Sequence, residues 1–247
     1  MKIYMASSWK MIDKVRELAQ LLRDNGHEVD DFTDSSRGRY VFFFKDLPGY
    51  EDLNAITLLD HEPAVKAFVE DKKYIDWSEV VFLLLPSGKS AHLEAGYAVG
   101  SGKKLIIFQE SYPFGEFDVM YGFADLITSD MKEALKFLSA IDERKVFKCN
   151  DDGVAEWCIA MDKQQAYEFM LKMWGESTMG EYIEEYYEDN PGSSLDEFIE
   201  CFFTEMPADQ DFCIKDAGES GGPLTRKISE WAISAVAVPF YLCCEDW

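Results

Sequence analysis

The sequence predicts an α/β fold built on an open parallel sheet, followed by a smaller acidic α+β domain. Two apolar runs, Val80–Leu85 and Leu105–Phe108, have the length of strands and the unbroken apolar character expected where both faces of a parallel sheet are covered. Segments with apolar residues at helical spacing separate such runs, and this alternation is typical of parallel sheets. With 247 residues, 47% of them hydrophobic, the chain is long enough for one large domain or two smaller ones.

The first 145 residues supply the alternating elements of the sheet. We expect further strands at Lys2–Ala6 and from His27, and helices at Met11–Asp24, Pro63–Tyr74, Ser90–Gly100 and Asp130–Leu138. Asn25-Gly26 ends the first helix, because these residues adopt the left-handed conformation at little cost. Residues 34–62 show no clear periodicity and receive no assignment. Residues 1–145 therefore form the expected flavodoxin-like or Rossmann-like domain.

The last hundred residues differ in composition: they are rich in acidic and aromatic side chains and contain all six cysteines. We place a domain boundary near residues 142–152 and an accessory domain at 146–247. The expected elements are a strand at Ala155–Ala160 and helices at Asp162–Trp174, Glu181–Asp189, Ser194–Phe203 and Arg226–Val236. Ser194 with Glu197 predicts a capping box. The cysteines lack the C-x-x-C spacing of zinc or redox sites, so we interpret them as reduced core or surface thiols.

The net charge of the chain limits the classes of partner that it can bind. The net charge is −23, of which residues 1–145 carry −7 and residues 146–247 carry −16. Such a surface repels phosphate backbones, so we expect no direct binding to nucleic acid, whereas the acidic domain could dock a protein partner. The sequence contains no long apolar run and no secretory h-region, which predicts a soluble, cytoplasmic protein without membrane binding.

Two loops follow strands at the edge of the sheet where ligands bind in such folds. The first holds Ser7, Ser8 and Trp9, and the second holds Ser87, Gly88, Lys89 and Ser90. Gly-Lys-Ser here is not a P-loop, because the glycine that belongs five residues before Gly88 is absent. The hydroxyls, the lysine and the start of the following helix predict a cradle for sugar hydroxyls or a phosphate.

Glu94 follows this second loop within the helix, and two interpretations stay open. It could be a solvated charge that the helix dipole favours, or a reacting carboxylate that works with Asp71 across a cleft. His92, two residues earlier, could line the same cleft. The three histidines of the chain lack metal-ligand spacing, so no metal site is expected.

Together, the stretches Lys2–Trp9, Gly26–Val29, Ser87–Ala98 and Gly102–Lys104, with Asp71 between them, resemble the nucleoside 2-deoxyribosyltransferase family over residues 1–138. This family includes 2'-deoxynucleoside 5'-phosphate N-hydrolases. Glu-Ala-Gly-Tyr-Ala, with the small-residue loop before it, is the most specific part. The resemblance implies cleavage or transfer of the N-glycosidic bond of a 2'-deoxynucleoside or its 5'-monophosphate. It implies no metal or other cofactor, and a homo-oligomer whose subunits complete each other's sites.

The resemblance also implies roles for individual residues. Glu94 matches the nucleophile, Tyr4 matches a tyrosine beside it, and Asp71 matches an aspartate that handles the base or its proton. Ser87 and Ser90 resemble positions that hold the sugar or the 5'-phosphate. The transferases commonly carry an aspartate where this chain has Gly88, and Lys89 with two serines suits a phosphorylated sugar, so a nucleotide substrate is favoured.

Other classes of function stay open. The same fold could be a catalytically inactive module that senses a nucleotide, with the acidic domain binding a protein. A weaker idea is an acidic mimic of nucleic acid. Residues 146–247 do not resemble the family, although Glu156–Ala160 and Pro239–Leu242 are faintly similar to accessory domains of phage proteins. If the enzyme interpretation holds, Tyr4, Asp71 and Glu94 meet at one cleft.

Overall fold

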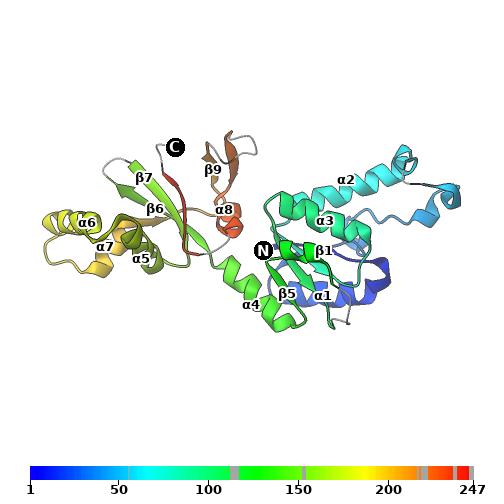
Figure 1. Cartoon of the computed structure of the whole chain (residues 1–247), viewed down its shortest axis with the longest axis horizontal. Helices are drawn as coiled ribbons and strands as arrows, with labels where there is room; N and C mark the ends of the chain where they lie inside the picture. The colour runs from blue at the N-terminus through cyan, green and yellow to red at the C-terminus, as the bar shows by residue number, and fades with distance from the viewer. Residues whose placement is uncertain are drawn as a thin grey trace. The chain divides into compact units, whose positions relative to one another are not determined.

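The computed structural model describes residues 1–54, 56–111, 117–151, 154–215, 217, 222–235 and 238–244. The chain forms two compact units, Met1–Leu138 and Ser139–Trp247 (Figure 1). Each unit has its own hydrophobic core. The two units are therefore described separately.

The first unit is built on a five-stranded sheet in which every strand pairing is parallel. Its strands lie in the order β2-β1-β3-β4-β5. Their bounds are β1 Lys2–Ala6, β2 Glu28–Asp31, β3 Val80–Leu84, β4 Lys104–Phe108 and β5 Leu126–Thr128. This is the flavodoxin-like order, so the predicted fold class is confirmed. The short β5 was not predicted, because three residues show too little periodicity to recognise.

Four α-helices flank the strands of this unit: α1 Ile12–Asp24, α2 Glu62–Trp77, α3 Lys89–Gly100 and α4 Met131–Asp142. Helices α2 and α3 lie on one face of the sheet and α1 on the other (Figure 1). Helix α1 buries Val15, Leu18, Ala19 and Leu22, as its apolar spacing predicted. Helix α2 is one turn longer than expected at its C-terminal end, and the additional residues bury Ile75.

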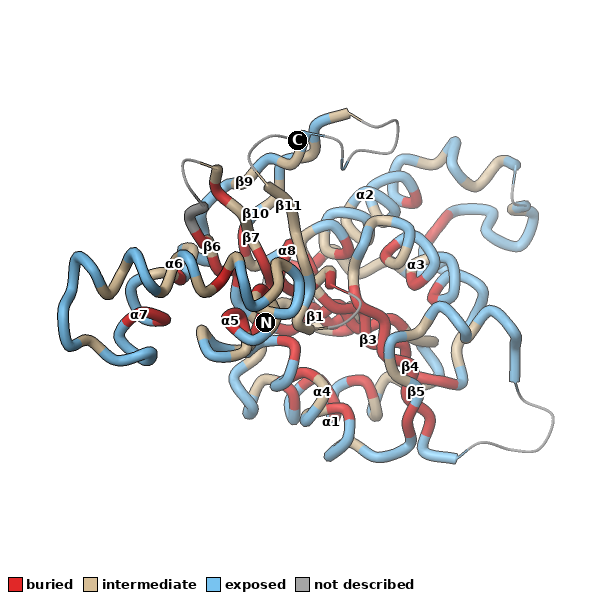
Figure 2. The backbone as a smooth tube through the Cα atoms, turned by 60° about the vertical axis from the view of Figure 1, so that its left-hand side comes forward, coloured by how far each residue is buried: buried red, intermediate tan, exposed pale blue. Residues whose placement is uncertain are grey.

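The core between the sheet and helices α2 and α3 follows from alternation along the strands. Tyr4 and Ala6 of β1 face the same side as Val81 and Leu83 of β3. Helix α3 meets them with three alanines, Ala91, Ala95 and Ala98. Their small side chains allow the helix to approach the sheet closely. The strands form the buried interior of the unit, whereas the helices expose their outer sides (Figure 2).

The segment between β2 and α2, which received no assignment, runs through short 3-10 helices. Their bounds are η2 Ser35–Arg37, η3 Phe44–Asp46, η4 Tyr50–Asp52 and η5 Leu58–Asp60. Two further 3-10 helices, η1 Trp9–Met11 and η6 Val119–Phe123, follow β1 and precede β5. Irregular backbone of this kind lacks the periodicity from which elements are predicted.

The second unit contains a four-stranded antiparallel sheet in the order β11-β7-β6-β8 and a separate hairpin of β9 and β10. The strands are β6 Lys145–Asp151, β7 Val154–Ala160, β8 Phe203–Glu205, β9 Asp211–Ile214, β10 Leu224–Lys227 and β11 Phe240–Cys244. The helices are α5 Lys163–Trp174, α6 Glu176–Asp189, α7 Leu195–Phe202 and α8 Ile228–Ser234. This α+β architecture agrees with the predicted class.

Two details of the second unit bear on the sequence predictions. The capping box of α7 is present, since Ser194 Oγ accepts from the amide of Glu197 and the glutamate accepts from the amide of Ser194. The last helix starts later than predicted, because Arg226 lies in β10, where it pairs with Phe212. The sequence also predicts a loop at Gly218–Pro223, most of which lies outside the described residues. Among the described helices, none combines the length and the apolar composition that crossing a bilayer requires.

Candidate active site

The candidate site lies where the strand order of the parallel sheet reverses. Chain connections leave β1 toward β2 on one side and β3 toward β4 on the other, so a crevice opens beyond the carboxyl ends of β1 and β3. Ser7 closes the base of this crevice, since its Oγ donates to the carbonyl of Leu84 at 2.9 Å. This hydrogen bond joins the ends of the two strands from which both predicted loops depart.

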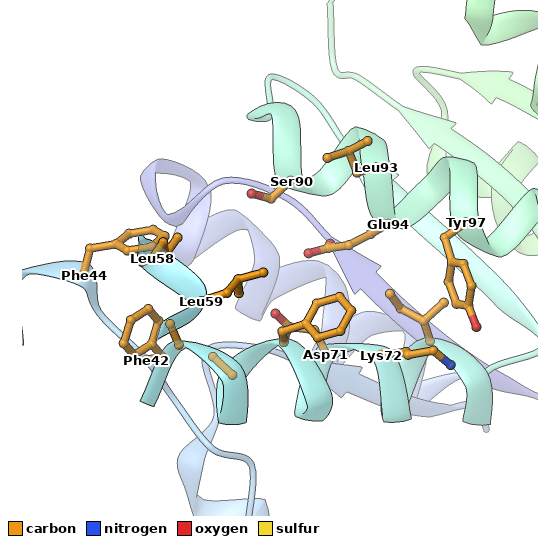
Figure 3. Close-up of a pocket in the computed structure, with 14 residues that line it drawn as sticks. Phe42, Phe44, Leu58, Leu59, Asp71, Lys72, Ser90, Leu93, Glu94 and Tyr97 are labelled. Atoms are coloured by element: carbon orange, nitrogen blue, oxygen red, sulfur yellow. The ribbon is translucent and has the colours of Figure 1, made fainter. Parts of the chain in front are cut away.

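Tyr4, Asp71 and Glu94 all line one cavity in this crevice. Tyr4 projects from β1 into the core between the sheet and α3, and only 1% of its surface is exposed. Glu94 shares a helical face with Ala91, Ala95 and Ala98, so the packing that buries the alanines leaves the glutamate half-buried. Asp71 lies one turn before the buried Ile75 on α2, and Figure 3 shows its side chain and that of Glu94 in the gap between α2 and α3.

Burial changes the pKa values of Glu94 and Tyr4. The pKa of Glu94 is raised from its usual 4.5 to about 7: loss of solvent is the largest cause and the negative charge of Asp71 adds to it, while a hydrogen bond from Tyr4 and the charge of Arg39 oppose the rise. Burial likewise raises the pKa of Tyr4 well above its usual 10, with added repulsion from Glu94 and Asp71. Tyr4 is therefore a neutral hydrogen-bond donor, and Glu94 exchanges its proton near neutral pH.

A buried arginine, Arg39, contacts the carboxyl groups of Asp71 and Asp30. The Arg39 side chain exposes 2% of its surface, and its Nη2 donates to Asp71 Oδ1 at 2.7 Å. Its Nε lies 3.4 Å from Oδ1 of Asp30, and its guanidinium lies over the Tyr74 ring, 4.7 Å from the centroid. Burial raises the pKa of Asp71, and the charge and hydrogen bond of Arg39 oppose that rise. Burial also raises the pKa of Asp30 to about 7.

One lobe of the cavity, which we call the polar lobe, has a volume of ≈ 360 Å³. Ser7, Ser8, Trp9, Gly88 and Ser90 contribute to its lining, so five of the predicted substrate-binding residues come together here. Lys10 adds a cation. The Trp9 ring is held by edge contact with Phe32 at 4.9 Å between centroids and by Phe43 at 4.6 Å. The polar lobe thus combines hydroxyls, a cation and an aromatic wall.

The second lobe, which we call the apolar lobe, extends between α2 and α3 and has a volume of ≈ 450 Å³ (Figure 3). Six residues line both lobes: Phe42, Phe44, Ala67, Asp71, Ser90 and Glu94. The rest of the apolar lobe is mainly aliphatic and aromatic, with Leu58, Leu59, Phe68 and Leu93 among its lining. The two carboxylates therefore lie where a polar and an apolar compartment meet.

Three predicted substrate-binding residues are placed differently. Ser87, Lys89 and His92 do not belong to the described lining of either lobe. His92 Nδ1 lies 2.9 Å from the carbonyl of Gly88 and 3.3 Å from Ser87 Oγ, and its ring stacks on Tyr121. Lys89 is the exposed first residue of α3. Lys89 and His92 are exposed on α3, whereas Ser87 precedes the helix and is half-buried.

Several residues of the site were not predicted from the sequence. The lining residues Tyr40, Phe42 and Phe44, and Arg39 next to the cavity, lie in the segment that received no assignment, and Lys10 follows the predicted loop by one residue. Aromatic density at Tyr40–Phe44 was a visible signal, since such rings commonly line ligand sites. Arg39 offered no signal, because its partners are distant in sequence and only the fold brings them together.

The geometry supports acid–base or nucleophilic chemistry by carboxylates. Paired carboxyl groups with a neutral tyrosine beside one of them suit attack on an electrophilic carbon and stabilisation of a positively charged transition state. In the part of the chain that the structure describes, no group of three or more His, Cys, Asp or Glu side chains is arranged to hold a metal ion.

Among solved structures, twelve chains match this one. The sequence matches no protein-family model and no curated protein. The CMP N-glycosidase BcmB of Clostridium botulinum is 17% identical with a TM-score of 0.36, and the match covers 57% of this chain and 98% of that one. A 2-deoxyribosyltransferase from Bacillus psychrosaccharolyticus is 22% identical with a TM-score of 0.39, covering 55% of this chain and 90% of that one. At these values the matches assign no activity, and the site itself carries the functional argument.

Proposed function

We propose that the chain cleaves or transfers the N-glycosidic bond of a 2'-deoxynucleoside or its 5'-monophosphate, with Glu94 as the nucleophile. The observation that carries this proposal is the cavity at the carboxyl ends of β1 and β3, which Tyr4, Asp71 and Glu94 line together. A half-buried glutamate with a pKa of about 7 beside a second carboxylate is unusual for a structural charge. Such a pair is typical of enzymes that act on glycosidic bonds.

The proposed reaction proceeds in two displacements. An oxygen of Glu94 forms a bond to the anomeric carbon of the sugar while the carbon–nitrogen bond breaks, and the electron pair leaves with the base. Water or a second base then attacks the same carbon, releases the Glu94 carboxylate and gives up a proton to the departed base. In hydrolysis, water thus supplies both the hydroxyl of the sugar and the proton of the base. Tyr4, a neutral donor, orients the glutamate.

The lobes suit the two parts of such a substrate. The polar lobe offers hydroxyls from Ser7, Ser8 and Ser90 and the cation of Lys10, which fit a sugar and its 5'-phosphate. Lys10 replaces Lys89 as the proposed phosphate partner, since Lys10 contributes to the described lining of the polar lobe and Lys89 does not. The Trp9 ring and the other aromatic side chains that line the polar lobe offer stacking surfaces for a base. The combined volume is within the range of small-molecule sites.

A substrate panel tests the proposal. The full chain is incubated with deoxynucleosides and their 5'-monophosphates, with and without an acceptor base, and free base is measured by chromatography. We expect base release, loss of that release in Glu94→Ala, and retention of it in Glu17→Ala, whose exposed side chain lies on α1. Release that survives Glu94→Ala would disprove the nucleophile. No release from any substrate would favour a module that binds a nucleotide without reacting.

We also propose that the chain forms a homo-oligomer through the rim of the apolar lobe. Phe68 and Val69 of α2 and Leu93 of α3 expose 58%, 56% and 75% of their surfaces. Large apolar side chains gathered on adjacent helices are typical of contact surfaces. Light scattering coupled to size exclusion would report the oligomeric state, and Leu93→Lys is expected to shift it toward the monomer.

A further inference from the structure

The proposed chemistry gives no role to the Arg39 guanidinium, which hydrogen-bonds Asp71 of the candidate site. This guanidinium is almost fully buried, and it belongs to the described lining of neither lobe. Burying a cation costs free energy unless carboxylates compensate for it. Arg39 has two such partners, which reach it from different elements: Asp30 of β2 and Asp71 of α2.

These two contacts differ in quality. Arg39 Nη2 donates to Asp71 Oδ1 at 2.7 Å, a short charge-assisted hydrogen bond. Arg39 Nε lies 3.4 Å from Asp30, and the geometry does not meet the criteria for a hydrogen bond. Asp30 Oδ2 has no hydrogen-bond partner among the described residues. The guanidinium therefore hydrogen-bonds Asp71 and faces Asp30 as an ion pair without a hydrogen bond.

The difference between these two contacts matters because more carboxyl groups than cations lie at this place. Asp30, Asp71 and Glu94 could carry three negative charges around a single buried cation. Further titratable groups acting on this cluster are Tyr4 of β1, Asp31 of β2 and Glu70 of α2. Asp31 and Glu70 have cations of their own, since Arg23 lies 3.6 Å from Asp31 and Lys73 lies 3.7 Å from Glu70. Because these two cations already face other carboxylates, near neutral pH the cluster retains protons. They reside on the carboxylates that the guanidinium does not hydrogen-bond.

We propose that Arg39 is a positioning residue that keeps Asp71 ionised, so that Asp71 acts in the cavity as a hydrogen-bond acceptor and the exchangeable proton resides on Glu94. The Asp71 side chain, 39% exposed, still has surface to offer a ligand. This inference rests on the proposed function for the identity of the ligand: an acceptor at this place selects a base that presents an N–H or amino group. It assigns Asp71 to base orientation rather than to proton donation.

Carboxyl titration tests the assignment without requiring activity. The full chain is labelled with ¹³C at the aspartate and glutamate carboxyls, and Asp71→Asn and Glu94→Gln identify the two signals. In Arg39→Gln we expect the pKa of Asp71 to rise by about 1 to 3 units, because a neighbouring arginine lowers the pKa of a carboxyl by that amount. Arg39→Lys keeps the charge and restores most of the difference, whereas Asp30→Asn leaves Asp71 ionised.

Matched variants separate positioning from folding. Arg23 makes a corresponding ion pair, with Nη2 3.6 Å from Oδ2 of Asp31 beside Asp30 on β2. We expect Arg23→Gln to leave the Asp71 titration unchanged. If the natural chain releases base, Arg39→Gln moves the acidic limb of kcat/KM upward by about one pH unit, which lost stability alone would not do. If Arg39→Gln does not fold, Arg39→Lys and Asp30→Asn still decide.

An unchanged Asp71 pKa in Arg39→Gln would overturn the inference, as would an Asp71 that titrates near pH 7 in the natural chain. These results are distinct from a failure of the proposed function. If no substrate releases its base, the nucleophile is wrong, yet the carboxyl titration still reports whether Arg39 holds Asp71 ionised.

Discussion

Replacing Glu94 by glutamine should stabilise the first unit, and the gain should grow with pH. Glutamine keeps the size of the side chain but cannot ionise. The folded chain raises the pKa of Glu94 from 4.5 to about 7, a difference that corresponds to ~3 kcal/mol. Since Glu94 is half-buried and water can relax around it, we expect a measured gain of about 1 to 3 kcal/mol at pH 8.

The sign follows from proton binding. Below pH 4.5 the glutamate is protonated in both states and contributes nothing to the pH dependence. Between pH 4.5 and about 7 the unfolded state has lost the proton that the folded state keeps, so the free energy of unfolding falls as the pH rises. Above about pH 7 both states are ionised and the loss is complete. Glutamine removes this loss, and the two proteins converge near pH 4.5.

Amide hydrogen exchange of β3 measures this difference in the full chain. Val80–Leu84 are buried at the centre of the sheet, so their exchange reports opening of the first unit rather than of the second. Protection is compared at pH 4.5, 6 and 8 after correction for the intrinsic rates, with Glu17→Gln as an exposed control. A Glu94→Gln difference that stays constant from pH 4.5 to pH 8 would refute the reasoning.

Three further predictions concern the pH dependence of base release, the hydrophobic core of the first unit and the capping box of α7. If Glu94 must be ionised to attack, base release rises with pH through about 7 and levels off above it; a flat profile from pH 5 to 8 in steady-state rates would exclude this requirement. Leu18→Ala, at a position 1% exposed on α1, should lower the free energy of unfolding by about 2 to 5 kcal/mol in urea titration. Ser194→Ala removes the capping box of α7 and should cost about 1 kcal/mol, seen as faster amide exchange at 195–198, while Ser193→Ala serves as the control.

The sequence predicted the sheet because its strands are local signals. Val80–Leu85 and Leu105–Phe108 are continuous apolar runs, and the helices between the strands repeat their apolar residues at helical spacing. The loops after β1 and β3 were predicted to border the site, and Ser7 and Ser90 line the polar lobe. Parallel strands end at one edge, so this placement followed from topology alone.

What the sequence by itself determined is thus the class of fold, the edge of the sheet that carries the cavity, and the residue types gathered along it. Only the tertiary structure decided which side chains face inward. Glu94 does so because α3 packs on the sheet through three alanines of the same face, whereas His92 and Lys89 lie on its outer side. The role of Arg39 could be inferred only from the tertiary structure, in which Asp30 of β2 and Asp71 of α2 lie beside it. The attraction between charges depends on distance in space and not on separation along the chain.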